Sequence, residues 1–446
     1  MLWLYRIFFV PVLLVLAPIY LRRMWRRGGY GAGFGQRLGG YVRRPRTGAP
    51  RVWLQAVSVG EMLAIGPLLE ALHVDGVEVW LTTTTSTGFR LANERYRTLA
   101  AAIGYFPIDW WPFSARAWRR IRPDLVILTE GERWPEHLAQ AAKRRVPVLS
   151  VNARLSDRSY RRMRRFPGAS RAMLRGVSRL LACSAQDAAR FRELGVSSER
   201  IVVTGNIKLD VDIPRLDDAA KARWRRDLGL AEGLVLLGSS TWPGEELALL
   251  EALKAARARG VACSLLLVPR HAERRNEIDA LLAPGGLRYH LRSRGNAPAA
   301  VDVAIADTTG ELRQLTQLAD LVFVGKSLPP HTEGQTPVEA AALEKPILFG
   351  PGMGNFRAIA RDLLARGAAW QVADRDALVR RSTELLEDGP RRADLAAAAA
   401  RWHRDNTGAV ARTLAIVREE LAAMAQRPAG RVEKSGARPT VAGERI

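Results

Sequence analysis

The chain has 446 residues, with 68 Lys and Arg against 45 Asp and Glu, and its formal net charge is +23. Hydrophobic residues make up 48% and charged residues 25%, a globular balance that excludes disordered, collagen-like and solenoid classes. The length exceeds one ordinary hydrophobic core and indicates two domains. The two cysteines, Cys183 and Cys263, lie in apolar runs, which excludes a disulfide framework and a Cys-rich metal site and favours a reducing compartment.

The N-terminal segment 1–27 is an apolar run followed by an arginine cluster. Residues 7–21 carry no charge, and as a helix they would be about 22 Å long, short of the roughly 30 Å hydrocarbon core. The run can span a bilayer only if Arg6 reaches the interface. A secretory signal carries its positive charge before the apolar run, so we interpret the segment as a retained membrane anchor. The cluster after the run consists of Arg22, Arg23, Arg26 and Arg27.

The arginines that follow the anchor place the rest of the chain on the cytoplasmic side, by the positive-inside rule. The alternative is that the segment is a buried N-terminal helix of the globular domain. Nothing amphipathic breaks the apolar run, which favours the anchor.

Short apolar runs alternate with helical patterns from residue 51 onward, in the order typical of parallel α/β units. Two consecutive Rossmann-like series are therefore predicted, joined by a linker at 207–218 that has mixed polarity and no helical period. Helical patterns are expected at 61–73, 135–145 and from 374 to about 425, and the polar, basic tail at 426–446 is expected to be disordered. The first series of expected strands is 51–57, 77–83, 124–130, 147–153 and 200–206. The second series is 234–240, 263–269, 301–307, 321–325 and 346–350.

Glu61 is the first candidate for chemistry. The strand at 51–57 leads into Ser58-Val59-Gly60-Glu61 and then a helix, so Glu61 falls in a first helical turn at the carboxyl end of a strand. Ligands of doubly wound sheets bind at that end. A carboxylate there could accept a proton from an incoming hydroxyl, although an ordinary acidic residue at a helix start would give the same pattern.

The second series has candidate phosphate contacts at the ends of its strands. The segment 237–246 predicts a strand, a small-residue turn and a helix start with free backbone N–H groups. Arg270 and His271 follow the strand at 263–269, where Arg270 could bind a phosphate with its guanidinium fork and His271 could be only a loop residue. The glycine-rich stretch around Lys326 precedes a helix that carries Glu339, and its spacing excludes a P-loop NTPase.

Nine segments occur in an order that resembles the bacterial 3-deoxy-D-manno-octulosonic acid (Kdo) transferases. The resemblance runs from about residue 7 to residue 386. These segments are SVGE (58–61), EGERWPEHL (130–138), PVLSVNARLSDRS (147–159), GNIKLD (205–210), GSSTWPGEE (238–246), LVPRH (267–271), VGKSL (324–328), GQTPVEAAALEKPILFGP (334–351) and NFR (355–357).

The resemblance implies a GT-B glycosyltransferase of lipopolysaccharide biosynthesis, with two Rossmann-like domains facing a cleft and an N-terminal membrane-anchoring helix. It implies that Kdo moves from CMP-Kdo to a hydroxyl of the lipid A precursor (lipid IVA), with inversion and without a metal or other cofactor. It also implies a protein of the inner membrane whose catalytic domains face the cytoplasm. The domains expected are the anchor at 1–27, an acceptor domain at 28–212, a CMP-sugar donor domain at 213–425 and the tail at 426–446.

By the same resemblance, Glu61 is the general base, and two further groups of residues bind the substrates. The residues implied on the acceptor side are Ser58, Gly60, Glu130, Glu132 and Trp134. The residues implied in CMP binding are Ser240, Thr241, Arg270, His271, Gly325, Lys326, Ser327, Gly334, Gln335 and Glu339.

Three positions depart from the pattern of the family. Gln55 stands where a histidine is usual, Trp242 replaces another histidine, and Thr336 lies where asparagine is common, next to an apparent one-residue insertion. These departures leave open another nucleotide-sugar donor, a nucleotide-sugar epimerase of the same fold, and a lipid-binding paralogue without activity. The positive charge is explained by a phosphorylated lipid acceptor and anionic lipids, with the run at 158–171 as a second basic surface or a solvated helix face. Nucleic acid is not an expected partner, because the basic residues have no aromatic interleaving.

Overall fold

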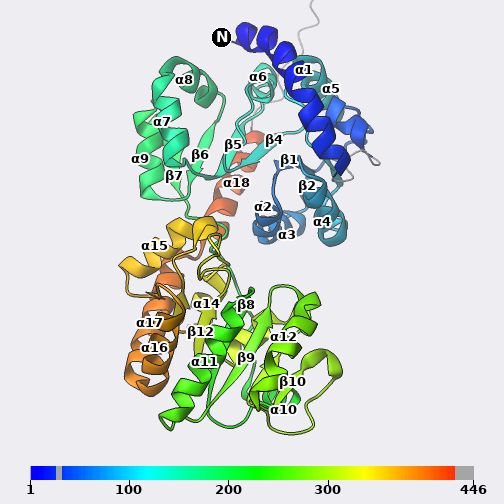
Figure 1. Cartoon of the computed structure of the whole chain (residues 1–446). Coiled ribbons are helices and arrows are strands. Elements are labelled where there is room, and N and C mark those ends of the chain that lie inside the picture. The colour runs from blue at the N-terminus through cyan, green and yellow to red at the C-terminus, as the bar shows by residue number, and fades with distance from the viewer. Residues whose placement is uncertain (1, 27–32, 427–446) are drawn as a thin grey trace, which may run out of the picture. The chain divides into compact units, whose positions relative to one another are not determined.

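The computed structural model of the chain describes residues 2–26 and 33–426. It divides into two compact units, the first formed by residues 1–208 together with 408–446 and the second by 209–407. Each unit is built on a seven-stranded sheet in which every pair of neighbouring strands is parallel (Figure 1). The expectation of two Rossmann-like α/β units is confirmed.

The sheet of the first unit has the strand order β3-β2-β1-β4-β5-β6-β7, so the direction of winding reverses between β1 and β4. Its central strands are buried along their whole length, as continuous apolar runs in a sheet covered on both faces require. The strands are β1 (Arg51–Gln55), β2 (Glu78–Thr83), β3 (Ala102–Tyr105), β4 (Leu125–Thr129), β5 (Val148–Ala153), β6 (Arg179–Ala182) and β7 (Ile201–Val203).

Helices cover both faces of this sheet and form two apolar cores, one around Trp53 and Trp118 and the other around Leu54 and Leu69. The helices of the first unit are α1 (Leu2–Arg26), α2 (Val59–Ala64), α3 (Gly66–Val74), α4 (Ser86–Tyr96), α5 (Trp111–Ile121), α6 (Pro135–Arg144), α7 (Asp157–Arg165), α8 (Pro167–Arg175), α9 (Ala185–Glu193) and α18 (Ala409–Ala425).

The second unit repeats this design with the strand order β10-β11-β9-β8-β12-β13-β14, and its winding reverses between β8 and β12. The strands are β8 (Leu234–Thr241), β9 (Cys263–Pro269), β10 (Tyr289–Leu291), β11 (Val303–Ile305), β12 (Leu321–Val324), β13 (Ile347–Phe349) and β14 (Trp370–Gln371). The helices are α10 (Asp218–Leu228), α11 (Glu245–Ala258), α12 (Arg275–Leu282), α13 (Leu312–Gln317), α14 (Val338–Ala342), α15 (Arg357–Ala365), α16 (Arg375–Glu387) and α17 (Gly389–Asn406).

All ten expected strands are present, and four strands were not predicted. These are β3, β6, β10 and β14, which have between two and four residues each and lie away from the centres of the sheets.

The C-terminal helix belongs to the first unit, which corrects the expected domain boundary at 425. Gly408 has a positive φ of 79° and separates α17 from α18. Leu414 and Val417 of α18 join the apolar core that includes Leu69, and Arg418 forms an ion pair with Asp75 at 2.7 Å. The sequence pattern predicts the helix but not the surface on which it packs. The expected disordered tail lies outside the described residues, apart from Gln426.

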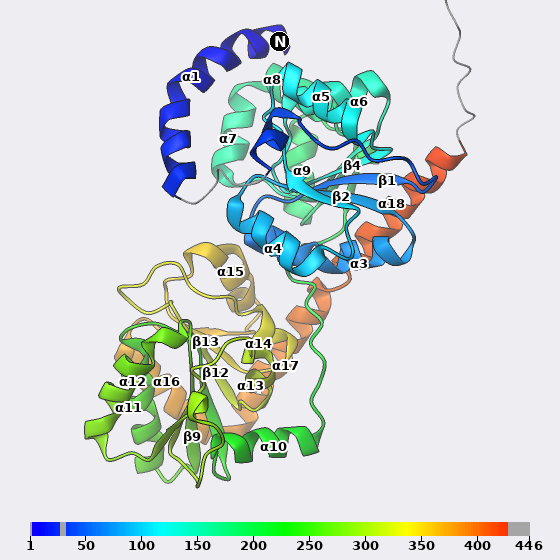
Figure 2. The same ribbon diagram turned by 90° about the vertical axis from the view of Figure 1, so that its right-hand side faces the viewer.

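The predicted N-terminal anchor is a helix, α1. Its window Leu2–Ile19 is long and apolar enough to cross a membrane, with a mean hydropathy of 2.1 and no buried residue. This is weak evidence of membrane association, because a signal sequence passes the same test. Figure 2 shows α1 as a bent rod along the outside of the first unit.

Candidate active site

The turn after β1 positions Glu61 at the point where the winding of the first sheet reverses. Ser58 is the N-cap of α2, and its hydroxyl oxygen accepts the backbone N–H of Glu61 at 3.2 Å. The Glu61 side chain turns back and accepts the Ser58 hydroxyl at 2.9 Å and the Val57 N–H at 3.0 Å. This arrangement is a variant of the capping box in which the Val57 N–H takes the place of the N-cap N–H, and it explains the local fold of the Ser-x-Gly-Glu segment.

A contact from another strand distinguishes Glu61 from an ordinary capping residue. The Thr129 hydroxyl, at the end of β4, donates to Glu61 Oε2 at 2.7 Å. Oε2 thus accepts two hydrogen bonds and Oε1 accepts one, within the described part of the chain. Each carboxylate oxygen can accept two, so Oε1 keeps a free site for a proton. Glu61 is 9% exposed.

Gln55, which replaces the usual histidine, lies in β1 and is fully buried. Its Oε1 accepts the Thr82 hydroxyl at 2.8 Å, and its Nε2 has no hydrogen-bond partner among the described residues. The Gln55 side chain therefore links the neighbouring strands β1 and β2.

The loop after β4 carries the other implied acceptor-side residues. The Trp134 indole N–H donates to Glu132 Oε2 at 2.8 Å. Burial raises the pKa of Glu132 above its ordinary value, and the nearby charge of Glu61 acts in the same direction, against the Trp134 hydrogen bond. Arg133 is buried behind this loop, and burial lowers its pKa to about 10. Glu132 is thus close enough to Glu61 to feel its charge.

Glu130 stands in a polar cluster that the sequence did not predict. It has a φ of +48°, at the sharp turn out of β4, and it forms ion pairs with Arg154 at 3.1 Å and with Lys208. Asn152, at the end of β5, donates to Glu130 and accepts the Ile207 N–H at 3.1 Å. Asn152 and Lys208 lie in segments that carry the family resemblance, which was the only available signal for them.

In the second unit the Gly-rich loop after β12 is fastened to the turn after β8 by Glu245. This buried carboxylate accepts four backbone N–H groups, a role that its own segment of sequence does not predict. The donors are Trp242 (2.9 Å), Lys326 (2.8 Å), Ser327 (2.8 Å) and Leu328 (3.1 Å). The two loops flank the reversal point of the second sheet, where doubly wound sheets bind ligands.

Close backbone packing explains the glycine at 325. A Cβ on Gly325 would lie 2.5 Å from the Ser240 carbonyl oxygen and 2.8 Å from the Thr241 Cα. Ser240 and Lys326 both have a positive φ, and Thr241 is fully buried. Gly334 and Gln335 close the loop through backbone N–H bonds to Lys326 (2.8 Å) and Gly325 (3.1 Å).

Ser327 is engaged within this loop. Its hydroxyl donates to the Val324 carbonyl at 2.5 Å and accepts the Gly350 N–H at 2.8 Å, and the residue is fully buried. The hydroxyl thus joins the ends of β12 and β13.

Three aromatic rings and one lysine lie close together near the carboxyl ends of β8, β9 and β12. The Lys326 ammonium lies 4.0 Å from the centre of the Trp242 ring, and the rings of His271 and His331 meet Trp242 edge-on at 5.3 and 5.8 Å. Trp242, the departure from the usual histidine, therefore packs among the residues implied in CMP binding. The Arg270 side chain is exposed and has no ion pair within the described residues.

Glu339 and Thr336 lie at the start of α14. Glu339 is in the first turn and forms an ion pair with Arg313 at 2.8 Å. The Thr336 hydroxyl accepts the Val338 N–H at 3.3 Å, so the departure at 336 satisfies the first N–H group of the helix.

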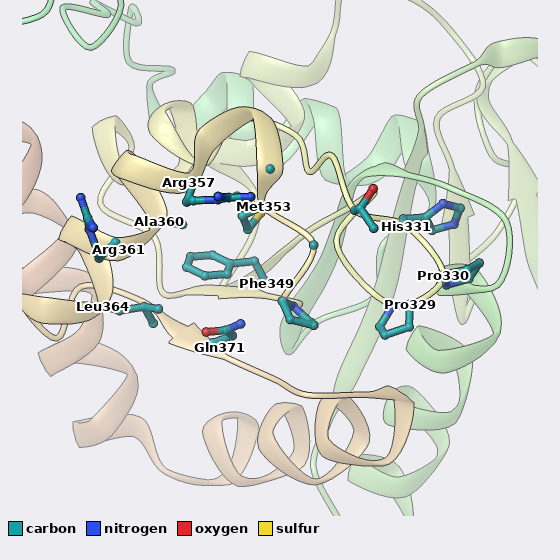
Figure 3. Close-up of a pocket in the computed structure, with 14 residues that line it drawn as sticks. Pro329, Pro330, His331, Phe349, Met353, Arg357, Ala360, Arg361, Leu364 and Gln371 are labelled. Carbon is teal, nitrogen blue, oxygen red and sulfur yellow. The ribbon is translucent and has the colours of Figure 1, made fainter. Parts of the chain in front are cut away.

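A cavity of about 570 Å³ opens beside the same loop, within the second unit. It is lined by His331 on one side, by Arg357 of α15 on the other, and by the apolar Phe349 and Met353 (Figure 3). The lining also includes Gly354, next to the NFR segment of the resemblance. Sequence reasoning did not predict this cavity.

Comparison with known proteins gives consistent matches. The family model described as 3-deoxy-D-manno-octulosonic-acid transferase (kdotransferase) matches residues 32–211. A 3-deoxy-D-manno-octulosonic acid transferase of Bordetella pertussis is 35% identical over 418 residues, which cover 90% of this chain and 95% of the relative. The enzyme of the same name from Haemophilus influenzae is 31% identical, with 93% and 95% covered.

Among solved structures, the UDP-GlcNAc 2-epimerase of Neisseria meningitidis, bound to UDP-GlcNAc, superimposes with a TM-score of 0.53 at 13% identity. It covers 84% of this chain and 100% of the epimerase, and at this identity it shows the two-unit fold alone. The two transferases named above match this chain over both units, and each is more than 30% identical to it. The chain therefore belongs to the 3-deoxy-D-manno-octulosonic acid transferase family and is a glycosyltransferase.

Proposed function

We propose that this chain transfers Kdo from CMP-Kdo to a hydroxyl group of the lipid A precursor, with inversion at the anomeric carbon. The observation that carries the proposal is the setting of Glu61, whose carboxylate is held by Ser58, Val57 and Thr129 at the reversal point of a parallel sheet. Membership of the family and the residues described below support this choice of donor and acceptor.

The first unit supplies the base. An inverting transfer needs one carboxylate to remove the proton of the attacking hydroxyl as the new glycosidic bond forms. Glu61 Oε1, with one hydrogen bond from Ser58, has the capacity to take that proton. We assign the neighbouring Glu130, Glu132 and Trp134 to contacts with the sugar hydroxyls of the acceptor.

The second unit holds the donor. The bond that breaks joins Kdo to the phosphate of CMP, and the leaving phosphate gains negative charge. Arg270 and Lys326 offer fixed positive charge, while the loop glycines allow the backbone to approach the phosphate closely. Glu339 is assigned to the ribose hydroxyls, as acidic residues are in related nucleotide sites. No step of this mechanism requires a metal ion.

In this proposal the remaining residues implied in CMP binding shape the donor site rather than contact the phosphate. Ser240 and Thr241 form the turn against which Gly325 packs, and His271 adjoins Trp242. Gln335 and Gly334 close the loop that Lys326 begins.

The membrane is the proposed location of the enzyme. The lipid acceptor, the exposed apolar helix α1 and the basic helix α7 support the cytoplasmic face of the inner membrane. Arg161, Arg162 and Arg165 of α7 are exposed, and Phe166, which follows them, is 58% exposed. Anionic lipids would bind such a surface.

The testing experiment offers the purified enzyme a labelled tetraacyl lipid A precursor with CMP-Kdo and, in parallel, with other CMP- and UDP-sugars. Mass spectrometry of the lipid should detect the addition of Kdo with CMP-Kdo only, and EDTA should leave the rate unchanged. If product formed with another sugar nucleotide, that nucleotide and not CMP-Kdo would be the donor. Gln55 and Trp242 would then be the first residues to test for the altered donor specificity. Absence of product with every donor, despite CMP binding, would favour the inactive lipid-binding paralogue.

A further inference from the structure

The first turns of α1 make polar contacts with the folded part of the first unit. Arg6 forms a two-pronged ion pair with Glu136 of α6, with Nε and Nη2 donating at 2.9 and 3.0 Å. The Tyr5 hydroxyl donates to Asp109 Oδ2 at 2.6 Å. The Glu136 side chain is fully buried, so this ion pair is a specific contact of the fold rather than a surface encounter.

The acceptors of these contacts are fixed by the fold itself. Asp109 also accepts the backbone N–H groups of Glu136 (3.1 Å) and His137 (2.9 Å) and so caps α6, whose own N-cap residue makes no side-chain capping bond. Gln140 donates to Glu136 at 2.8 Å. Without Arg6, a buried carboxylate would lose its only cationic partner among the described residues.

The helix is not equally exposed on all sides. The half-buried residues of α1 recur at three- and four-residue intervals, which places them on one stripe. The residues between them on the opposite face, such as Phe8, Val12 and Val15, are exposed and apolar. The stripe consists of Leu2, Tyr5, Arg6, Phe9, Val10, Leu13 and Ala17.

These contacts exclude a spanning helix. The helical path from Arg6 to Arg26 is about 30 Å, which equals the thickness of the hydrocarbon core. If α1 crossed the bilayer, Arg6 would lie on the opposite side from Glu136, and the ion pair could not form. With Arg6 at Glu136 and the other end leading into the same unit, both ends of α1 lie on one side of the membrane.

We infer that α1 is an in-plane membrane helix, with Tyr5 and Arg6 of its first turns docked on the first unit and its exposed apolar face inserted in one leaflet. The inference rests on the proposed membrane association and goes beyond it by fixing the topology. The exposed apolar residues of such a helix need cover, and in this arrangement the first turns pack on the protein while lipid covers the apolar face. Arg6 is tolerated in the apolar run because it faces Glu136 and not the acyl chains.

Topology is tested on the full chain with a hydrophilic, protease-cleavable tag placed ahead of Met1. A membrane-impermeant protease should remove the tag in inside-out vesicles and leave it intact on spheroplasts. The polar tag cannot stay within lipid, so it is cut from one side or the other. Any cleavage on intact spheroplasts would show that α1 crosses the membrane and would overturn the inference.

Docking is tested by cross-linking in native membranes. Trp3 and Trp111 both lie against the Arg6 guanidinium, at 5.9 and 6.0 Å. Trp3→Cys with Trp111→Cys should give a linked peptide pair with a short bismaleimide, detected by mass spectrometry. The matched control is Leu16→Cys with Trp111→Cys, because Leu16 is exposed and lies about 20 Å further along the helix. Equal linkage of both pairs, or none of the first, would contradict docking.

The ion pair itself is tested in the same assay. Arg6→Gln should lower the yield of the 3–111 link, whereas Arg22→Gln, at the other end of α1, should leave it unchanged. Measuring Kdo transfer in the same membranes separates the two proposals. If the enzyme is active but its tag is cleaved on spheroplasts, only the proposed topology is wrong. If the enzyme without substitutions transfers no Kdo and its tag is cleaved only from the cytoplasmic side, only the proposed activity is wrong.

Discussion

The Thr129 hydroxyl donates to Glu61 Oε2 at 2.7 Å and so joins the ends of two neighbouring strands, β4 and β1. The two residues are 68 positions apart in the sequence and meet where the winding of the sheet reverses. This bond fixes a carboxylate that its own helical turn would hold only from one side. Two predictions follow from the geometry, one for each residue.

Replacing Glu61 tests the base. Glu61→Gln preserves the size and the capping position but cannot accept a proton, and a general base contributes about 10²–10⁴-fold to rate. We expect kcat to fall within that range while CMP binding, measured by calorimetry, stays unchanged. Glu70→Gln, on an exposed position of α3, is the matched control and should be fully active. A Glu61→Gln enzyme with near-normal turnover would mean that Glu61 only caps its helix.

Replacing Thr129 tests the positioning of that base. Thr129→Val removes the donor to Glu61 while keeping the shape of the side chain, and a hydrogen bond to a charged group is worth about 1.5–3 kcal/mol. We expect kcat to fall roughly 10–100-fold, with the KM for either substrate little changed. Thr129→Ser, which retains the hydroxyl, should restore most of the rate. If Thr129→Ser is as slow as Thr129→Val, the methyl group and not the hydroxyl matters.

Arg270 is predicted to bind the donor phosphate. Its side chain is exposed at the end of β9 and forms no ion pair within the described residues, so Arg270→Gln should not disturb the fold. Loss of a charge-assisted bond should raise the KM for CMP-Kdo roughly 10–100-fold and leave the KM for the lipid unchanged. Arg288→Gln, a change of the same type just before the edge strand β10, is the control. An unchanged donor KM would remove Arg270 from the site.

Local contacts of the site could be predicted from the sequence, and distant ones could not. The bond between Ser58 and Glu61 spans three residues, so a cap followed by an acidic residue is sufficient to indicate it. Thr129 and Glu245 act on partners 68 to 83 positions away, and nothing in their own segments reveals those partners. Long-range contacts of this kind depend on strand order, which short apolar runs do not specify.

The same limit explains the misplaced helix α18. Its apolar pattern predicts a helix from local periodicity alone. Its partner surface on α3 lies more than 300 residues earlier, and the Arg418 to Asp75 ion pair spans 343 positions. The expected boundary followed chain order, whereas the chain returns to the first unit to cover α3.

Two buried groups of the first unit, Asp109 and His137, should have opposite effects on how the free energy of unfolding depends on pH. Burial raises the pKa of Asp109 from 3.8 to about 6 and lowers the pKa of His137 from 6.5 to about 3. At pH 5 the unfolded chain holds one proton on His137, and the folded chain holds one on Asp109. The proton counts are equal, so this pair contributes no pH dependence to stability between about pH 4 and pH 6.

Replacing either residue should reveal the pH dependence of stability that the other one causes. In Asp109→Asn only the unfolded state binds a proton in that window, so stability relative to the unaltered enzyme should fall on acidification by about 1.4 kcal/mol per pH unit. In His137→Gln only the folded state binds one, so relative stability should rise on acidification with the opposite slope. Urea unfolding followed by tryptophan fluorescence at several pH values measures both. Slopes of the same sign would refute the assignment.

Basic helix α7 is predicted to add electrostatic attraction to anionic lipid. Arg161, Arg162 and Arg165 are exposed and form no ion pair within the described residues, and basic residues near such a surface contribute about 1 kcal/mol each. Replacing all three by serine should weaken binding to anionic liposomes by roughly 100-fold. Binding to neutral liposomes, which depends on α1, should not change.

The matched control replaces three exposed arginines of the second unit, Arg380, Arg401 and Arg404, by serine. Because both variants lose the same net charge, a difference between them reports the location of the surface. Co-sedimentation at increasing salt should also show that the unaltered enzyme loses its preference for anionic lipid, since salt screens exposed charges. Equal weakening in both variants would mean that net charge, and not α7, attracts the membrane.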